Sequence, residues 1–213
     1  MIKAVIFDLD GLLIDTEIVS YRIYKELLKE YGYSFSVEEY SSTYSGKTEV
    51  MNVTTLIETY HLPWTVEQGL REVLKAEERM IAEGIDLKAG AKELLTYLKE
   101  NQYKTAIATS STRDRALMIL NQHEFAGYFD EFVFAEDITR SKPDPEGYLK
   151  ACDRLGEKPE NCLVLEDSEA GILAAYSAGI PVICIPDMKI PAKEYLDKTM
   201  LVLKALDEVI KIL

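Results

Sequence analysis

The chain has 213 residues, of which 47% are hydrophobic and 29% are charged, a composition typical of a globular protein. This length suits one large α/β domain, or a core domain that carries a small insert. Asp and Glu outnumber Lys and Arg by 37 to 24, which gives a formal net charge of −13. Because such a surface repels phosphate backbones and anionic lipid headgroups, the composition argues against nucleic-acid and membrane partners.

The three cysteines, Cys152, Cys162 and Cys184, are odd in number and form no Cys-x-x-Cys pair. A disulfide framework or a structural zinc site is therefore not expected. Cys162 and Cys184 each border an apolar run and are predicted to be buried thiols in a reducing compartment. The first apolar run ends at Asp8 and is far shorter than a signal-peptide core or a membrane span, so we expect a cytoplasmic protein.

Short apolar segments alternate with helical segments along much of the chain. Buried strands are predicted at residues 2–7, 105–108, 132–135, 162–165 and 181–185. Helices are predicted at residues 91–99, 113–122, 146–155 and 169–178, with a final amphipathic helix at 205–213. This alternation predicts an α/β fold with a Rossmann-like parallel sheet core in three layers, α/β/α, with helices on both faces.

Between the first strand and residue 85 the alternation fails, because residues 16–85 show helical spacing throughout. Helices are predicted at residues 16–31, 48–60 and 65–83, which indicates a small all-helical cap domain inserted after the first strand. We expect the core domain to comprise residues 1–14 and 89–213, and the cap domain residues 15–88. Five aromatic residues are predicted to form the core of the cap rather than a ligand site: Tyr31, Tyr33, Phe35, Tyr40 and Tyr44.

Reactive side chains follow three of the predicted strands, and a fourth group lies in a loop beside one of them. The four groups are Asp8 with Asp10, Thr109-Ser110-Ser111, Ser141-Lys142-Pro143, and Glu166-Asp167-Ser168. Taken singly, an aspartate after a strand is usually a turn residue or a helix cap, and a loop lysine is usually solvated. Because the carboxyl ends of parallel strands meet at one edge of a sheet, the four groups together predict a functional site.

The residue types at this edge indicate phosphate chemistry. Asp8, Asp10 and Asp167 offer oxygen ligands of the kind that Mg²⁺ prefers, and Mg²⁺ also binds substrate phosphate. Lys142 and the Thr109 hydroxyl could hold phosphate oxygens beside the ion, and one aspartate could be a nucleophile. No G-x-G-x-x-G or Walker A pattern follows a strand, so dinucleotide and ATP sites lack their usual signals.

Four motifs resemble those of the haloacid dehalogenase superfamily and occur in the same order. They are Asp8-Leu9-Asp10-Gly11, Thr109-Ser110, Lys142-Pro143-Asp144-Pro145 and Glu166-Asp167-Ser168. The resemblance covers essentially the whole chain, because the helical insert falls where the small caps of this superfamily lie. Residues 11–17 and 166–171 are similar to the β-phosphoglucomutase-like phosphatases of that superfamily.

The resemblance implies a role for each matching residue. Asp8 would attack phosphorus, and Asp10 would protonate the leaving group and then activate water against the aspartyl phosphate. Mg²⁺ would be held by Asp8, the Asp10 carbonyl and Asp167, with Glu166 acting directly or through water. The transferring phosphoryl group would be bound by Thr109, the Ser110 backbone N–H and Lys142. The expected activity is a Mg²⁺-dependent phosphatase for a small phosphorylated metabolite such as a sugar or polyol phosphate.

The same resemblance assigns substrate selection to the cap. Lys47 lies in a short loop that resembles the specificity loop of the family, and Ser20 follows the predicted hinge by one helical turn; both are candidate substrate contacts. A solvated surface lysine is the alternative for Lys47. The related mutases have Gly-x-x-Arg in this loop, where the arginine clamps a second phosphate, but this chain has Glu49 at the arginine position. A sugar-phosphate mutase is therefore only the second candidate, after a phosphatase.

A non-enzymatic alternative is a receiver-type signalling module, which also combines acidic residues, a hydroxyl, a lysine and Mg²⁺. Receiver domains are about half this length and have no helical cap, so an enzyme is favoured. We expect a monomer whose partner is a small phosphorylated metabolite.

Overall fold

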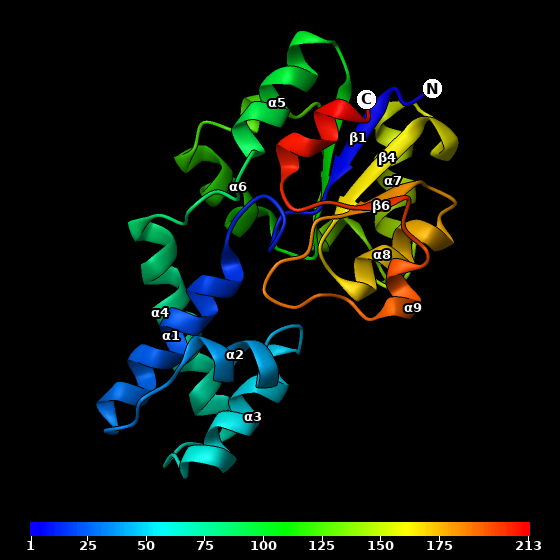
Figure 1. Ribbon diagram of the computed structural model, residues 1–213. Coiled ribbons are helices and arrows are strands. Elements are labelled where there is room, and N and C mark those ends of the chain that lie inside the picture. The colour runs from blue at the N-terminus through cyan, green and yellow to red at the C-terminus, as the bar shows by residue number, and fades with distance from the viewer. The chain divides into compact units, whose positions relative to one another are not determined.

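The computed structural model describes residues 1–213, which divide into two compact units (Figure 1). The core unit comprises Met1–Asp15 and Asp86–Leu213, and the cap unit comprises Thr16–Ile85. The sequence placed these junctions at residues 14/15 and 88/89. They shift into the insert because the Asp15 N–H donates to the Asp86 carbonyl (3.0 Å) and the Lys88 N–H to the Leu13 carbonyl (2.9 Å). Through these bonds, both segments that connect the insert to the core belong to the core unit.

The core unit is built on a six-stranded sheet in which every pair of neighbours is parallel, in the order β3-β2-β1-β4-β5-β6. The strands are β1 (Ala4–Phe7), β2 (Lys104–Ala108), β3 (Glu131–Val133), β4 (Cys162–Glu166), β5 (Val182–Cys184) and β6 (Leu201–Val202). Phe7 of β1 lies opposite Ile107 of β2 and Leu165 of β4. The carboxyl ends of these three strands therefore meet, and the predicted fold class is confirmed.

Helices cover both faces of this sheet (Figure 1). They are α5 (Ala91–Glu100), α6 (Arg113–Gln122), α7 (Glu146–Leu155), α8 (Glu169–Ser177) and α9 (Lys193–Leu196), with short 3₁₀ helices η1 (Ala126–Tyr128), η2 (Ala135–Asp137), η3 (Pro159–Asn161) and η4 (Leu206–Lys211). Helices α7 and α8 pack against a face that includes Ala4, Ile6 and Val164. Alternate residues of β1 point to the opposite face, so the whole strand is apolar and buried.

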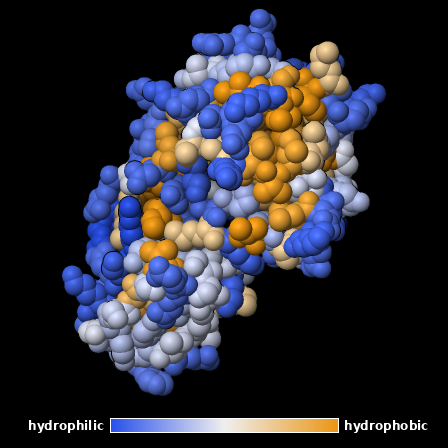
Figure 2. Space-filling model, viewed as in Figure 1, coloured by the Kyte–Doolittle hydropathy of each residue, from blue (hydrophilic) through white to orange (hydrophobic).

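The C-terminal part of the core unit differs from the sequence prediction. The final helix is a 3₁₀ helix, η4, and both β6 and α9 were missed because they have only two and four residues. Leu201 and Val202 remain partly exposed at this edge, in the region of the core unit where Figure 2 shows apolar atoms at the surface. Cys162 and Cys184 are buried free thiols, as predicted.

The cap unit consists of four helices: α1 (Thr16–Glu30), α2 (Val37–Thr43), α3 (Glu49–Tyr60) and α4 (Val66–Glu83). Each of the last three begins after a residue whose hydroxyl caps the first turn: Ser36, Thr48 and Thr65. At the start of α4, Thr65 and Gln68 cap each other reciprocally, which fixes where the helix begins. No helix in either unit is long and apolar enough to cross a membrane.

The aromatic core of the cap unit is only partly the predicted one. Phe35, Tyr40 and Tyr44 are buried, as predicted. Tyr31 and Tyr33 are 40% and 41% exposed, so their predicted burial is wrong. Both lie in the turn after α1, outside the helical spacing that directs side chains inward.

Candidate active site

Asp8 occupies the middle of the sheet edge because it directly follows the central strand β1. Its backbone N–H donates to the Leu165 carbonyl (3.1 Å), and its side chain is buried. The chain then turns at Gly11, which has a φ of +83° and whose N–H donates to the Ile14 carbonyl (3.0 Å). A Cβ at Gly11 would lie 2.5 Å from Oδ2 of Asp167, so this turn requires glycine for its conformation and for space.

Two further carboxylates meet that of Asp8. Asp8, Glu166 and Asp167 each offer an oxygen, and these oxygens lie within 4.8 Å of one another. The Oδ1 atom of Asp167 is buried without a hydrogen-bond partner. Burial, reinforced by the charges of Glu166 and Asp8, raises the pKa of Asp167 well above its usual value. A buried group of oxygen donors with an unpartnered carboxylate oxygen fits a hard divalent cation such as Mg²⁺.

Lys142 connects two of these carboxylates. Its Nζ donates to Asp8 Oδ1 and to Glu166 Oε1, the latter at 2.7 Å. Burial opposes the charged form of Lys142, but the carboxylates of Asp8 and Glu166 outweigh it and raise its pKa well above the usual value. Lys142 is therefore a buried ammonium ion in contact with the predicted nucleophile.

Glu166 is fully buried, and both its oxygens are occupied by donors. Oε1 accepts from Lys142 and from the Tyr148 hydroxyl (2.8 Å). Oε2 accepts from the Asp167 N–H (2.9 Å), the Ser168 N–H (2.8 Å) and the Ser168 hydroxyl (2.9 Å). Burial alone would raise the pKa of Glu166, but the Lys142 charge and these hydrogen bonds have the larger, opposite effect. The pKa of Glu166 therefore lies below its usual value, and Glu166 is ionised. Glu166 thus orients Lys142 and the turn into α8.

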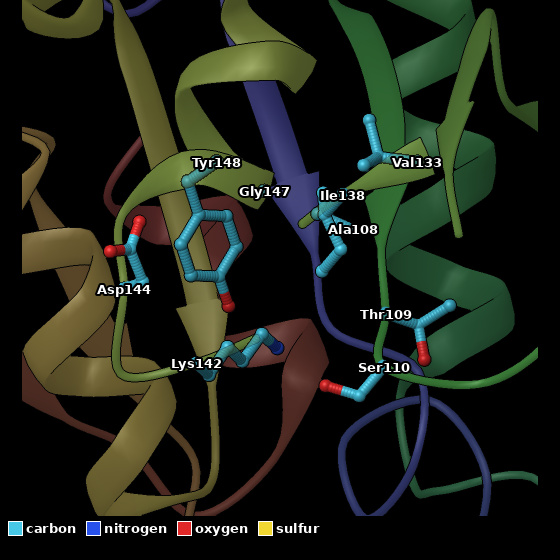
Figure 3. Close-up of a pocket in the computed structure, with 9 residues that line it drawn as sticks. All are labelled: Ala108, Thr109, Ser110, Val133, Ile138, Lys142, Asp144, Gly147 and Tyr148. Atoms are coloured by element: carbon cyan, nitrogen blue, oxygen red, sulfur yellow. The ribbon is translucent and has the colours of Figure 1, made fainter. Parts of the chain in front are cut away.

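Thr109 and Ser110 follow β2, the strand on the other side of β1. The Thr109 N–H donates to the Val133 carbonyl (3.0 Å), and its hydroxyl accepts from the Ser111 N–H (3.0 Å). Thr109 is buried and Ser110 is exposed. Both line a small pocket with Lys142, and Figure 3 shows the Lys142 amine and the Ser110 hydroxyl pointing toward one another near the end of β1. The structure thus brings these three predicted phosphate-binding residues together.

The Asp10 side chain is bonded to residues at the start of α6 and is not part of the carboxylate cluster. Its Oδ1 accepts from Arg115 Nη1 (2.7 Å), and its Oδ2 accepts from the Ser111 hydroxyl (2.6 Å). Arg115 Nη1 also donates to the Ser111 hydroxyl (2.6 Å), which closes a triangle. Arg115 and Tyr148 were not predicted from the sequence to belong to the site. The i,i+4 spacing of Ser111 and Arg115 is the one signal that joins Arg115 to a strand end.

The two candidate substrate contacts in the cap are Ser20 and Lys47. Ser20 is half-buried on α1, and Lys47 is exposed in the turn that precedes α3. Glu49, which the sequence comparison aligned with the arginine expected in a mutase, is the first residue of α3, and its Oε1 accepts from the Tyr24 hydroxyl (2.8 Å). Glu49 is therefore held by a buried residue of the cap.

Comparison with known proteins identifies the family of the chain. A profile of haloacid dehalogenase-like hydrolases matches residues 5–185. A phosphorylated carbohydrates phosphatase of Thermotoga maritima is 35% identical over 178 residues, which cover 84% of this chain and 82% of the relative. A haloacid dehalogenase-like protein of unknown function from Agrobacterium tumefaciens has a TM-score of 0.85 at 26% identity, covering 100% of this chain and 97% of the other.

A mutase is also among the similar structures. The β-phosphoglucomutase of Clostridium difficile has a TM-score of 0.72 at 27% identity, covering 98% of this chain and 93% of the mutase. These matches confirm the family that the four motifs predicted, and with it the expectation of an enzyme. The chain belongs to the haloacid dehalogenase-like hydrolases.

Proposed function

We propose that the chain is a Mg²⁺-dependent phosphatase that hydrolyses a small phosphorylated metabolite, a sugar or polyol phosphate, through an aspartyl phosphate. The observation that carries this proposal is the contact of the Lys142 ammonium with Asp8, within the Asp8–Glu166–Asp167 cluster. Phosphoryl transfer requires in-line positioning and positive charge on the phosphoryl oxygens. Lys142 provides such a charge in a chain whose net charge is −13.

The metal would be held by Asp8, Asp167 and the Asp10 carbonyl, with Glu166 acting directly or through water. Since both oxygens of Glu166 already accept hydrogen bonds, the water-mediated contact is favoured. When bound, Mg²⁺ would neutralise charge on the phosphoryl oxygens and on Asp8.

Protein groups supply the remaining steps. Asp8 attacks phosphorus, and the Thr109 hydroxyl, the Ser110 N–H and Lys142 hold the phosphoryl oxygens. Asp10 gives a proton to the leaving oxygen and then takes one from the water that attacks the aspartyl phosphate. Ser111 and Arg115 each bind one oxygen of Asp10 and so orient its carboxylate.

In the cap, Lys47 and Ser20 are proposed to contact the part of the substrate that leaves. Lys47→Ala should then reduce kcat/KM for the best substrate much more than for a small generic phosphate ester. An equal reduction for both would exclude a role of Lys47 in discrimination.

A mutase is the second candidate, because a mutase is among the similar structures. Glu49 argues against it: two unit charges about 4 Å apart interact by about 4 kcal/mol at an effective dielectric near 20, so a carboxylate repels a second phosphate that an arginine would attract. Incubation with β-glucose 1-phosphate and catalytic bisphosphate should give little glucose 6-phosphate. Efficient isomerisation with negligible phosphate release would establish the mutase instead.

The proposal is tested by a screen of phosphorylated metabolites that measures released inorganic phosphate. Sugar and polyol phosphates should release phosphate with Mg²⁺, and a chelator or the Asp8→Asn substitution should abolish the release. Activity that survives both treatments would contradict the proposal.

A further inference from the structure

We propose that Asp187, held in place by Lys88, orients the water shell of the metal ion bound at the Asp8–Asp167 cluster. The inference rests on the metal requirement of the proposed function. Asp187 lies three residues after β5 (Val182–Cys184), and β5 is the neighbour of β4 in the sheet. The strand that follows the Glu166–Asp167 strand therefore brings another carboxylate to the same edge.

The backbone at Gly11 shows how close this carboxylate is to Asp167. A Cβ built on Gly11 would lie 2.5 Å from Asp167 Oδ2 and 3.3 Å from Asp187 Oδ2. Both carboxylates therefore face the same point of the turn after β1. The Asp187 side chain is only 7% exposed, so this arrangement lies inside the core unit rather than on its surface.

Lys88 fixes the other side of this carboxylate. Its Nζ donates to Asp187 Oδ1 and lies 3.9 Å from Asp15 Oδ1. Its backbone N–H donates to the Leu13 carbonyl (2.9 Å), which anchors Lys88 to the turn that contains Gly11. One oxygen of Asp187 is thus held by an ammonium group, and the other faces Gly11 and Asp167.

This orientation suits a water-mediated contact with the metal. Mg²⁺ takes few protein carboxylates and keeps several water molecules. A carboxylate that accepts a hydrogen bond from a metal ligand or from metal-bound water fixes the orientation of that ligand or water. Loss of such a carboxylate typically lowers metal affinity about 10–100-fold. Lys88 has two effects in this arrangement: it orients Asp187, and it compensates a negative charge that would otherwise be buried.

The test is the Mg²⁺ affinity of the full chain without substrate, measured by isothermal titration calorimetry. Asp187→Asn keeps the shape of the side chain and should weaken Mg²⁺ binding about 10-fold. Lys88→Met should also weaken it, because Asp187 loses its fixed orientation, and Lys88→Arg should restore most of the affinity. Lys193→Met, which removes an exposed ion pair with Asp197 on α9, is the matched control and should bind Mg²⁺ like the wild type. Melting temperatures of the metal-free variants establish that each is folded.

The direction in which Lys88→Met changes the Mg²⁺ affinity shows whether Asp187 acts through its orientation or only through its charge. If Asp187 acted only as a distant charge, removal of the Lys88 ammonium would tighten Mg²⁺ binding. Tighter binding in Lys88→Met, or unchanged binding in Asp187→Asn, would overturn the inference while leaving the proposed function intact. A wild-type chain that binds no Mg²⁺ would overturn the metal dependence of the proposed function and this inference with it.

Discussion

The guanidinium of Arg115 donates from Nη1 to Oδ1 of Asp10 at 2.7 Å. With Ser111 on the second oxygen, both oxygens of the Asp10 carboxylate have partners outside the cluster formed by Asp8, Glu166 and Asp167. Asp8 and Asp10 are two residues apart, yet one is buried against a lysine and the other is bonded to an arginine and a hydroxyl. Different surroundings allow two neighbouring carboxylates to perform different tasks.

This separation gives a prediction for Asp10→Asn. Turnover should fall by about 10²–10⁴-fold, the usual contribution of a general acid–base group. Mg²⁺ affinity should stay close to that of the wild type, because the proposed ligand is the backbone carbonyl of Asp10. Steady-state kinetics and calorimetry measure the two effects separately. A loss of Mg²⁺ affinity comparable to that in Asp8→Asn would show that the Asp10 carboxylate itself binds the metal.

Lys142→Met should destabilise the metal-free fold. Its ammonium is bonded to two buried carboxylates, and removal of one partner from a buried ion pair costs about 3–5 kcal/mol. We expect a loss of about 3 kcal/mol, at the lower end of that range, because Glu166 retains donors from Tyr148 and Ser168. Urea unfolding without Mg²⁺ measures the free energy of unfolding.

The matched control for that measurement is Lys193→Met, whose lysine forms an exposed pair with Asp197. Exposed pairs typically contribute about 0–1 kcal/mol, so this variant should unfold nearly like the wild type. Equal losses in both variants would mean that the buried position of Lys142 has no special effect on stability.

Gly171→Ala should disturb the site from within α8. A Cβ at this position would lie 1.6 Å from Glu166 Oε1, so Glu166 must move and release some of its donors. Overpacking of this kind costs about 1–3 kcal/mol, although alanine favours a helix more than glycine does. Gly147→Ala in α7 is the control, since nothing lies within 4 Å of its Cβ, and its stability should not fall. Thermal unfolding compares them; a Gly171→Ala variant as stable as Gly147→Ala would contradict the tight packing of Glu166.

The effect of Mg²⁺ on stability should increase with pH. Burial, with Glu166 and Asp10 adding to it and Lys142 opposing it, raises the pKa of Asp8 from 3.8 to about 7. An acid whose pKa rises on folding stabilises the fold below its unfolded pKa, and this contribution is lost as pH rises through about 7. Asp167 shifts in the same direction.

Mg²⁺ binds the deprotonated carboxylates, so it should stabilise the fold at pH values where the protonated carboxyl of Asp8 no longer does. The rise in melting temperature caused by saturating Mg²⁺ should therefore be larger at about pH 8 than at about pH 6. Asp8→Asn should reduce this pH dependence, and Asp167 accounts for the part that remains. A Mg²⁺-induced rise that is the same at both pH values would show that Asp8 and Asp167 are already ionised in the metal-free fold.

The site residues that could be predicted from the sequence are those whose position depends only on the strand that they follow. Asp8, Thr109 and Asp167 each follow a strand, and parallel strands bring such residues to one edge whatever their separation along the chain. Arg115 and Asp187 were missed because their contacts depend on how α6 and the segment after β5 lie on the sheet. No local pattern encodes this placement. Similarly, β6 has only two residues, too few for any periodic signal.

The most direct test of the account is to trap the phosphoryl group on the enzyme. A substrate found in the metabolite screen is mixed with enzyme and Mg²⁺, quenched with acid within the first turnover, and the protein is digested for mass spectrometry. We predict one phosphoryl group on Asp8, with more of it in Asp10→Asn, where attack of water on the aspartyl phosphate is slowed. Phosphate released in the first turnover with no phosphorylated Asp8, or with the phosphoryl group on another residue, would contradict the account.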